Sequence, residues 1–234
     1  MDILYIVMPA YNEEANIEET VKAWYPNLEG KHKDSRLVIA DSGSSDLTHE
    51  ILLRLQKDYP KLEILDKTGK LHGPKVFALY DYAIKKGADY IFQTDSDGQT
   101  LAEEFPEFWC RRKEAAMVIG HRNHRQDGFS RIIVTKVLKA VIGVMFHVNV
   151  TDANTPYRLI QADVLKEQMH LIPRDYNLSN VLVSVIFVKK KLGVLFLPIT
   201  FRPRQGGVNS INVRKIFKLG WKALADFRRL SKEI

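Results

Sequence analysis

The sequence predicts an α/β fold built on a mostly parallel sheet with helices on both faces. In the first part of the chain, short apolar runs alternate with longer segments whose apolar residues recur every three or four positions. Strands that alternate with crossover helices form parallel sheets covered on both sides. The length of 234 residues and the 45% apolar content are enough for one large domain with a substantial core.

The first four strands and three helices follow from these runs in order. An apolar run ends at Pro9, and the helix after it opens beyond Asn12 with acidic residues in its first turn, where the helix dipole favours them. Ser45 or Asp46 can cap the second helix. The expected strands are residues 3–9, 36–42, 61–67 and 88–97, and the expected helices are residues 13–28, 44–60 and 73–87.

The rest of the chain is expected to complete this domain and to end in a separate helix. The main domain, residues 1–210, closes with a helix at 103–116, a strand at 117–123, a helix at 161–168 and a helix-plus-strand unit at 180–204. Residues 211–234 carry apolar side chains three to four positions apart with basic residues between them. This spacing predicts an amphipathic C-terminal helix.

The composition excludes several classes of protein. The single Cys110 excludes a disulfide framework and a zinc site made of thiolates, and it fits a reducing compartment. The N-terminus lacks the basic start of a signal peptide. The apolar stretch 140–148 is well short of the ~20 residues that span a bilayer. We therefore expect a cytoplasmic protein that is not integral to the membrane.

The positive charge is concentrated at the C-terminal end. From residue 202 onward, nine Lys and Arg residues stand against two acidic ones, a net of +7 that equals the net charge of the whole chain. Together with the basic, apolar segment 129–148, this end is suited to an anionic membrane surface, with the protein peripheral on the cytoplasmic face of that membrane. The alternative is that both segments pack their apolar faces on the domain. No nucleic acid is expected as a partner, because no helix-turn-helix or RNA-binding signature occurs.

Polar residues stand at the carboxyl ends of the expected strands, where ligands bind in such sheets. Asp95 and Asp97 end the fourth strand and point to the same side if the backbone is extended. Both carboxylates can then face one hard divalent cation, although an ordinary acidic turn explains the pattern as well. Asp41 ends the second strand, where a carboxylate can accept hydrogen bonds from a base or a ribose. Arg122 follows the strand at 117–123 and is a candidate for binding an anion.

These stretches come in a familiar order. The segments "IVMPAYNEEANIEETV", "VIADSGSSDLT", "YIFQTDSDGQ", "GHR", "TDANTPYR" and "FRPRQGGVNS" resemble those of the family 2 glycosyltransferases with the GT-A fold, over nearly the whole chain. Within that family the chain looks most like the polyprenyl- and dolichyl-phosphate sugar synthases. The resemblance implies a GT-A type, Rossmann-like sheet, a nucleotide-sugar donor and Mg²⁺ or Mn²⁺ as the cofactor.

The resemblance also implies roles for individual residues. Asp95 and Asp97 would hold the metal, and Asp97, Asp152 and Arg122 would be catalytic. The residues implied for nucleotide-sugar binding are Pro9, Tyr11, Asn12, Glu13, Asp41, Lys75, Asp95, Ser96, Asp97 and Gln99. The residues implied for the acceptor phosphate are Arg122, Arg131, Arg158, Arg204 and Ser210.

The chain departs from the family pattern at three points. The loop before the third helix, "LHGPKVFAL", lacks the fuller glycine pattern, and Thr155-Pro156-Tyr157-Arg158 replaces the usual Ser-Gly-Phe-Arg, which leaves the acceptor open. Many relatives continue into transmembrane helices, so the chain is either a peripheral member or a truncated one. A separate membrane subunit or a second copy of the chain is then a further expected partner.

The expected reaction is a metal-dependent, inverting transfer of a sugar to a polyprenyl phosphate. A lipid phosphate is already ionised and needs arginines rather than a base, whereas a sugar hydroxyl would need one, with Asp152 as the candidate. The alternatives are a transferase that extends a surface polysaccharide or lipid-linked glycan, a nucleotidyltransferase, and a non-catalytic module that binds anions or nucleic acid. The identities of the sugar and of the nucleotide stay open.

Overall fold

The computed structural model describes residues 1–122, 129–203 and 227–231, with the backbone alone for residues 129–136. Its strands are β1 (Leu4–Ala10), β2 (Arg36–Asp41), β3 (Leu62–Leu65), β4 (Tyr90–Gln93), β5 (Met117–Arg122), β6 (Arg158–Gln161) and β7 (Val194–Ile199). Its α-helices are α1 (Ile17–Trp24), α2 (Thr48–Leu55), α3 (His72–Lys85), α4 (Phe105–Cys110), α5 (Phe129–Phe146), α6 (Ala162–Gln168) and α7 (Ser179–Lys189). Short 3₁₀ turns lie at Tyr25–Leu28, Ala102–Glu104 and Met169–Leu171.

The strands form one mixed sheet in the order β3-β2-β1-β4-β6-β5-β7. All neighbouring pairs are parallel except the two that involve β6, which runs antiparallel to β4 and to β5. The predicted mostly parallel α/β sheet is therefore confirmed. The sequence does not predict β6, because this four-residue strand passes directly into α6 without a turn signal.

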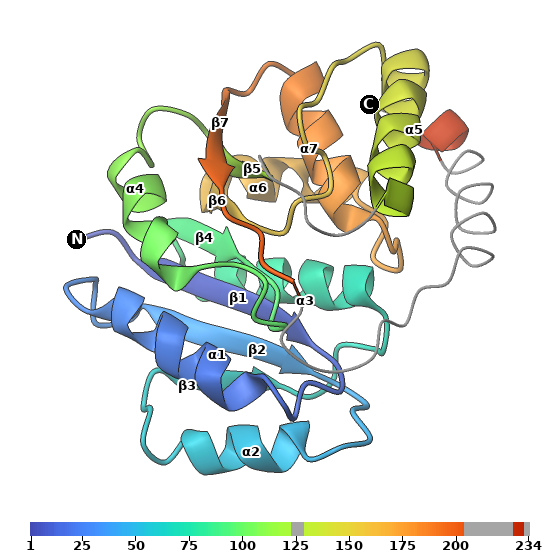
Figure 1. The fold of residues 1–234 in the computed structure, drawn as a ribbon. Coiled ribbons are helices and arrows are strands. Elements are labelled where there is room, and N and C mark those ends of the chain that lie inside the picture. The colour runs from blue at the N-terminus through green and yellow to red at the C-terminus, as the bar shows by residue number, and fades with distance from the viewer. Residues whose placement is uncertain (123–128, 204–226, 232–234) are drawn as a thin grey trace.

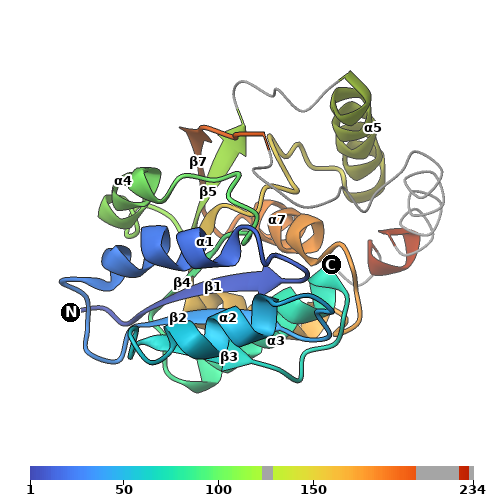
Figure 2. The same ribbon diagram turned by 60° about the horizontal axis from the view of Figure 1, so that its bottom comes forward.

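Helices cover both faces of the sheet, as predicted (Figure 1; Figure 2). On one face, alternate strand residues such as Ile6 and Phe92 pack against α1, α2 and α4. On the other face, residues such as Val7 and Ile91 pack against α3, α5, α6 and α7. This alternation follows from the strand geometry, which turns successive side chains to opposite faces. The strands are apolar on both faces because both faces are buried.

The described part of the C-terminal tail packs on the domain. Phe227 and Leu230 are buried, and the ring of Phe227 meets that of Phe146 in α5 at 5.3 Å between centroids and 74°. For these two residues, the alternative prediction that the segment packs on the domain is confirmed. The rest of the predicted amphipathic helix, residues 211–226 and 232–234, lies outside the described residues. In the part of the chain that the structure describes, no helix combines the length and the apolarity needed to cross a bilayer.

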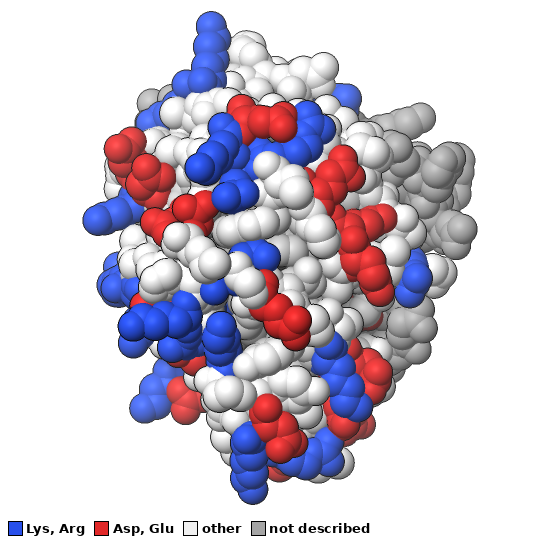
Figure 3. Space-filling view, turned by 90° about the vertical axis from the view of Figure 1, so that its left-hand side faces the viewer, with Lys and Arg blue, Asp and Glu red and all other residues white. Residues whose placement is uncertain are grey.

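The side of the molecule that carries the N-terminus and α4 has a mixed surface charge (Figure 3). Lysines and arginines stand beside acidic residues there, as in the ion pairs of Arg112 with Asp2 at 2.7 Å and of Arg111 with Glu114 at 2.8 Å. Interspersed charges of both signs give no strong field that would attract an anionic partner. The polar groups that matter for binding lie elsewhere, at the carboxyl ends of the strands.

Candidate functional site at the carboxyl ends of the strands

The strand order predicts a binding site between β1 and β4, which we call the crevice. From β1 the chain moves to β2 and β3 on one side, whereas β4 pairs with β1 on the other. At such a reversal, the loops that leave the carboxyl ends of the strands diverge and leave room for a ligand. The loops after β1, β2 and β4 contain most of the polar residues expected from the sequence to bind the donor.

Asp41 ends β2 as a buried carboxylate with two partners. Only 2% of its surface is exposed. Its Oδ1 accepts a hydrogen bond from the Ser44 hydroxyl, and its Oδ2 lies 3.1 Å from Nδ1 of His49 in α2. The sequence analysis missed His49, and its place eight residues after Asp41, on the first turns of a helix, is the signal that could have identified it.

The loop after β1 is tied to the loop after β2. Asn12 has a left-handed backbone (φ 55°), and its backbone N–H donates to Oγ of Ser44 at 3.0 Å. Its side-chain Oδ1 accepts from the backbone N–H of Ser45 at 2.8 Å. The backbone N–H of Glu13 donates to Oγ1 of Thr48 at 2.8 Å, and Oε2 of Glu13 accepts from Asn16. Asn12 and Glu13 therefore shape the crevice, while Tyr11 is 47% exposed and presents its ring to it.

Asp46 acts at the start of α2. Its Oδ1 accepts from the backbone N–H of Thr48 at 3.1 Å, and its Oδ2 accepts from that of Glu14 at 3.1 Å. The bond to Thr48 occupies a backbone donor that has no partner within the first turn of α2, and the bond to Glu14 ties the loop after β1 to the start of that helix. The capping interpretation of Asp46 therefore fits the structure.

Lys75 is a buried cation at the inner end of the crevice. Its side chain is 1% exposed, its Nζ donates to the backbone carbonyl of Ala10, and it lies 5.2 Å from the centre of the Tyr11 ring. Burial lowers the pKa of Lys75 to about 8, and the nearby Asp41 opposes that shift. A positive charge is thus held beside the position where the loops after β1 and β2 meet.

Asp95 and Asp97 follow β4 on either side of a buried serine. Asp95 Oδ1 lies 3.1 Å from Nε2 of His72, and Asp97 Oδ1 accepts from the backbone N–H of Gln99 at 3.2 Å. Ser96 is 2% exposed and donates to the carbonyl of Pro9 at 2.9 Å. The structure therefore gives the side chain of Ser96 an anchoring role between β1 and β4 instead of the expected contact with the donor.

The two carboxylates suit a hard divalent cation. Mg²⁺ and Mn²⁺ are commonly held by one or two carboxylates, with substrate phosphates and water completing the shell. Among the described residues, no three His, Cys, Asp or Glu side chains gather as a metal-binding group. A cation held by Asp95 and Asp97 would complete its shell with water and substrate oxygens.

Gln99 connects the Asp97 loop to the segment that follows β7. Its side-chain Nε2 donates to the carbonyl of Arg202 at 2.9 Å, and its own carbonyl accepts from the backbone N–H of Arg202 at 2.8 Å. Gln99 is 8% exposed, and its side-chain amide holds the segment that follows β7. Through these bonds Gln99 ties the Asp97 loop to backbone atoms of Arg202.

Arg122 and Asp152 form a bidentate ion pair. Arg122 Nε donates to Asp152 Oδ2 at 2.8 Å, and Nη2 donates to Oδ1 at 2.9 Å, with side-chain exposures of 11% and 7%. The guanidinium also lies 5.0 Å from the centre of the Phe201 ring. Two parallel charge-assisted hydrogen bonds give such a pair a defined geometry. The sequence places both residues at the site but not in contact with each other.

Arg158 differs from the prediction. It is 0% exposed within β6, and its guanidinium donates to the backbone carbonyls of Thr155, Asn180 and Ala153. A guanidinium that is enclosed and bonded in this way stabilises the loop around Asp152 instead of contacting an acceptor phosphate. Arg204 and Ser210 lie outside the described residues, as does the side chain of Arg131.

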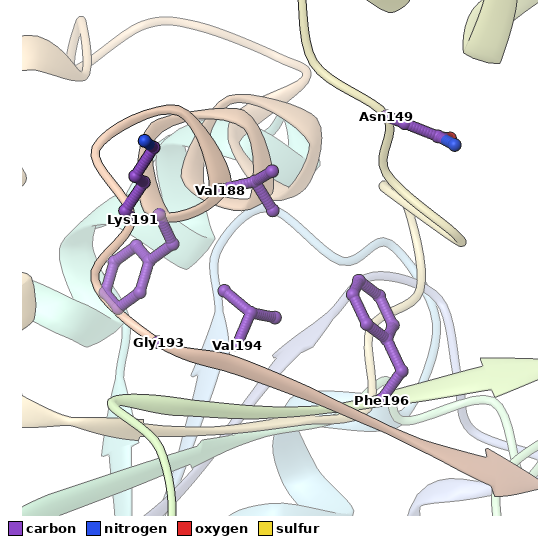
Figure 4. Close-up of a pocket in the computed structure, with 7 residues that line it drawn as sticks. Asn149, Val188, Lys191, Gly193, Val194 and Phe196 are labelled. Atoms are coloured by element: carbon purple, nitrogen blue, oxygen red, sulfur yellow. The ribbon is translucent and has the colours of Figure 1, made fainter.

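A separate hollow lies at the end of α7 (Figure 4). It has a volume of about 340 Å³, and it is lined by Asn149, Phe187, Val188, Lys191, Gly193, Val194 and Phe196. Because β7 runs parallel to β5, the start of β7 lies at the edge of the sheet opposite to the polar loops. None of the residues named above for the crevice lines this hollow, so it is not part of the candidate site.

Comparison with known proteins identifies the family. The family model "Glycosyl transferase family 2" matches residues 5–170. The undecaprenyl-phosphate 4-deoxy-4-formamido-L-arabinose transferase of Edwardsiella ictaluri is 22% identical over 92% of the chain and 64% of its own length. The transferase of the same name from Salmonella choleraesuis is 25% identical over 58% of the chain and 42% of its own length. The chain thus matches about two fifths to under two thirds of these relatives.

Solved structures match the fold over almost the whole chain. Glucosyl-3-phosphoglycerate synthase from Mycobacterium tuberculosis, in complex with Mn²⁺, UDP-glucose and phosphoglyceric acid, has a TM-score of 0.73 at 13% identity and covers 99% of this chain and 80% of its own. The same enzyme with Mn²⁺, UDP and phosphoglyceric acid has a TM-score of 0.71 at 14% identity. At this identity the likeness establishes the fold.

Proposed function

The chain belongs to glycosyl transferase family 2, and from that premise we propose that it transfers a sugar from a nucleoside diphosphate sugar to a polyprenyl phosphate. The single observation that carries this choice of acceptor is the bidentate pair of Arg122 with Asp152. Matched relatives bear the name of undecaprenyl-phosphate sugar transferases, which supports the same choice.

The donor would occupy the crevice between β1 and β4. Asp41 would orient Ser44 and His49 beside the base, and the exposed ring of Tyr11 would stack on the base. Lys75 would place its ammonium group near the diphosphate. Asp95 and Asp97 would hold Mg²⁺ or Mn²⁺, which when bound supplies positive charge to the departing diphosphate.

The bonding of Asp152 supports a phosphate as the acceptor. A sugar hydroxyl must lose a proton as it attacks, so it needs a carboxylate directed at it. Both carboxylate oxygens of Asp152 instead accept from Arg122. A phosphate monoester is already ionised at neutral pH, so its oxygen can attack the anomeric carbon without a base. The bond from that carbon to the diphosphate breaks on the opposite side, which inverts the configuration.

Arg122 would dock this phosphate. Within the described residues, the pair with Asp152 uses Nε and Nη2, and the Nη1 amino group would be the one that meets the phosphate. A guanidinium that is already oriented by a carboxylate loses little conformational freedom when it binds phosphate oxygens. Arg131, Arg204 and Ser210 are proposed to complete the acceptor site, as the resemblance implies.

The exposed face of α5 supports a peripheral contact with the membrane that carries such an acceptor. Val137 is 56% exposed and Val144 is 73% exposed, and these residues lie two helical turns apart on one side of the helix. Lys139 is also exposed on α5. An exposed apolar pair on a helix whose sequence also carries basic residues suits the headgroup layer of an anionic membrane. We place this contact on the cytoplasmic side.

The proposal is tested by a screen of nucleotide sugars with Mn²⁺ or Mg²⁺ that follows nucleoside diphosphate release with and without polyprenyl phosphate. We expect release that depends on the lipid phosphate and on the metal, and that falls at least a hundredfold in Asp97→Asn. Asp163→Asn, an exposed carboxylate in α6, is the matched control and should keep full turnover. Turnover with a glycan acceptor alone, or release of pyrophosphate, would reject the proposal in favour of a polysaccharide transferase or a nucleotidyltransferase.

A further inference from the structure

The segment of residues 200–202, which we call the strap, leaves the end of β7 and crosses toward the loop after β4. It is held at both of its ends. The backbone N–H of Thr200 donates to Oε1 and Oε2 of Glu104 at 2.9 and 3.2 Å. At the other end, the backbone N–H of Arg202 donates to the backbone carbonyl of Gln99 at 2.8 Å, and the side-chain Nε2 of Gln99 donates to the carbonyl of Arg202 at 2.9 Å.

Phe201 lies between these two anchors, and its ring covers Arg122. The guanidinium carbon is 5.0 Å from the ring centre, within the range of a cation–π contact. Arg122 comes from β5 and Asp152 from the loop before β6, so the ring, the guanidinium and the carboxylate belong to three separate parts of the chain.

The two contacts restrain different features of the guanidinium. Asp152 bonds to the edge formed by Nε and Nη2, which restrains the group within its plane. The Arg122 guanidinium lies over the Phe201 ring, and this contact opposes tilting of the group out of its plane, a movement that the ion pair alone tolerates. With both contacts present, the Nη1 group keeps one direction.

We propose that Phe201 is a positioning residue that fixes Arg122 for the acceptor anion, and that Gln99 fixes Phe201 in turn by holding the strap. The nature of the anion rests on the proposed function, whereas the restraint on Arg122 does not. Preorganised groups bind more tightly because less freedom is lost on binding. Gln99 bonds both to the strap and to Asp97. It therefore also helps to set the distance between Arg122 and the proposed metal ligands.

The variants Phe201→Leu and Phe201→Tyr test this role as a matched pair. Leucine keeps apolar bulk but has no π face, whereas tyrosine keeps the face. We expect Phe201→Leu to raise the KM for the acceptor about three- to tenfold, the range that a cation–π contact supports. The kcat and the KM for the donor should stay within about twofold. Phe201→Tyr should restore the acceptor KM.

A second measurement does not depend on activity. The ¹⁵N–¹H signal of Arg122 Nε, identified by its loss in Arg122→Lys, should show a lower order parameter in Phe201→Leu than in the wild type and in Phe201→Tyr. Gln99→Met, which removes the side-chain bond to Arg202, should shift it in the same direction and serves if Phe201→Leu does not fold. An unchanged order parameter in Phe201→Leu and Gln99→Met would overturn the inference. If no polyprenyl phosphate is glycosylated but the order parameter falls, the proposed acceptor is wrong and the positioning role stands.

Discussion

Replacing Lys75 by methionine removes a buried positive charge from the crevice while keeping an apolar side chain of similar length. Lys75 is 1% exposed, and burial lowers its pKa from 10.5 to about 8. Between these two values the unfolded chain binds more protons at this position than the folded protein does. The free energy of unfolding of the wild type therefore rises with pH in that window, through this residue. Below about pH 8 both states carry the proton, and the cost of burying the charge is constant.

The magnitude follows from the same shift. One pKa unit corresponds to about 1.36 kcal/mol, so the shift costs the folded protein about 3 kcal/mol at neutral pH. At about pH 9.5 most of that cost is gone, so the free energy of unfolding is about 2 kcal/mol higher than at neutral pH through this residue. Screening by water at the open side of the crevice reduces it to about 1–2 kcal/mol. The lost hydrogen bond to Ala10 lowers the stability of the variant by an amount that does not depend on pH, so the pH dependence isolates the charge.

The assay is urea denaturation of the wild type and of Lys75→Met, followed by tryptophan fluorescence at several values from about pH 7 to 9.5. The stability of the variant relative to the wild type should fall by about 1–2 kcal/mol across this range. Lys85→Met is the control, because Lys85 lies on the same helix but is 69% exposed, and it should show no such trend. Stability curves for Lys75→Met and the wild type that run parallel in pH would refute the reasoning. The same variant should bind the donor more weakly.

Two further predictions test the packing around the site, the first with a comparison variant. Gly73→Ala places a Cβ 2.0 Å from the carbonyl oxygen of Tyr176 and 2.6 Å from Cα of Asn177. Neither backbone atom can move alone, so we expect the free energy of unfolding to fall by more than about 2 kcal/mol in urea denaturation. Gly143→Ala in α5, where the nearest contact to the added Cβ is 3.9 Å away, should be neutral or stabilising by up to about 1 kcal/mol, and equal effects at the two positions would contradict the packing argument. Asp152→Asn leaves Arg122 without its anionic partner and should lower the free energy of unfolding by about 3 kcal/mol, as is typical when a buried ion pair loses one member; a loss below about 1 kcal/mol by thermal and urea denaturation would mean that the pair is not a structural element of the site.

The parts of this protein that depend on local pattern could be predicted from the sequence. The apolar runs identified β1, β2, β3 and β4, and the period of the segments between them identified the helices that join them. Because the carboxyl ends of parallel strands meet at one edge, the positions of Asp41, Asp95 and Asp97 along the chain were enough to bring them to one crevice. Motif order identified the family for the same reason, since those motifs occupy successive loops.

The parts that depend on contacts between distant residues appear only in the tertiary structure. Arg122 and Asp152 are 30 positions apart, and Gln99 and Arg202 are 103 positions apart, so no periodicity relates them. Arg158 and Ser96 occur in motifs that suggest binding, but the fold buries both side chains and bonds them to backbone carbonyls. A residue type states which bonds a side chain can form. Burial and strand order decide which partner it meets, because they are set by the packing of the whole chain.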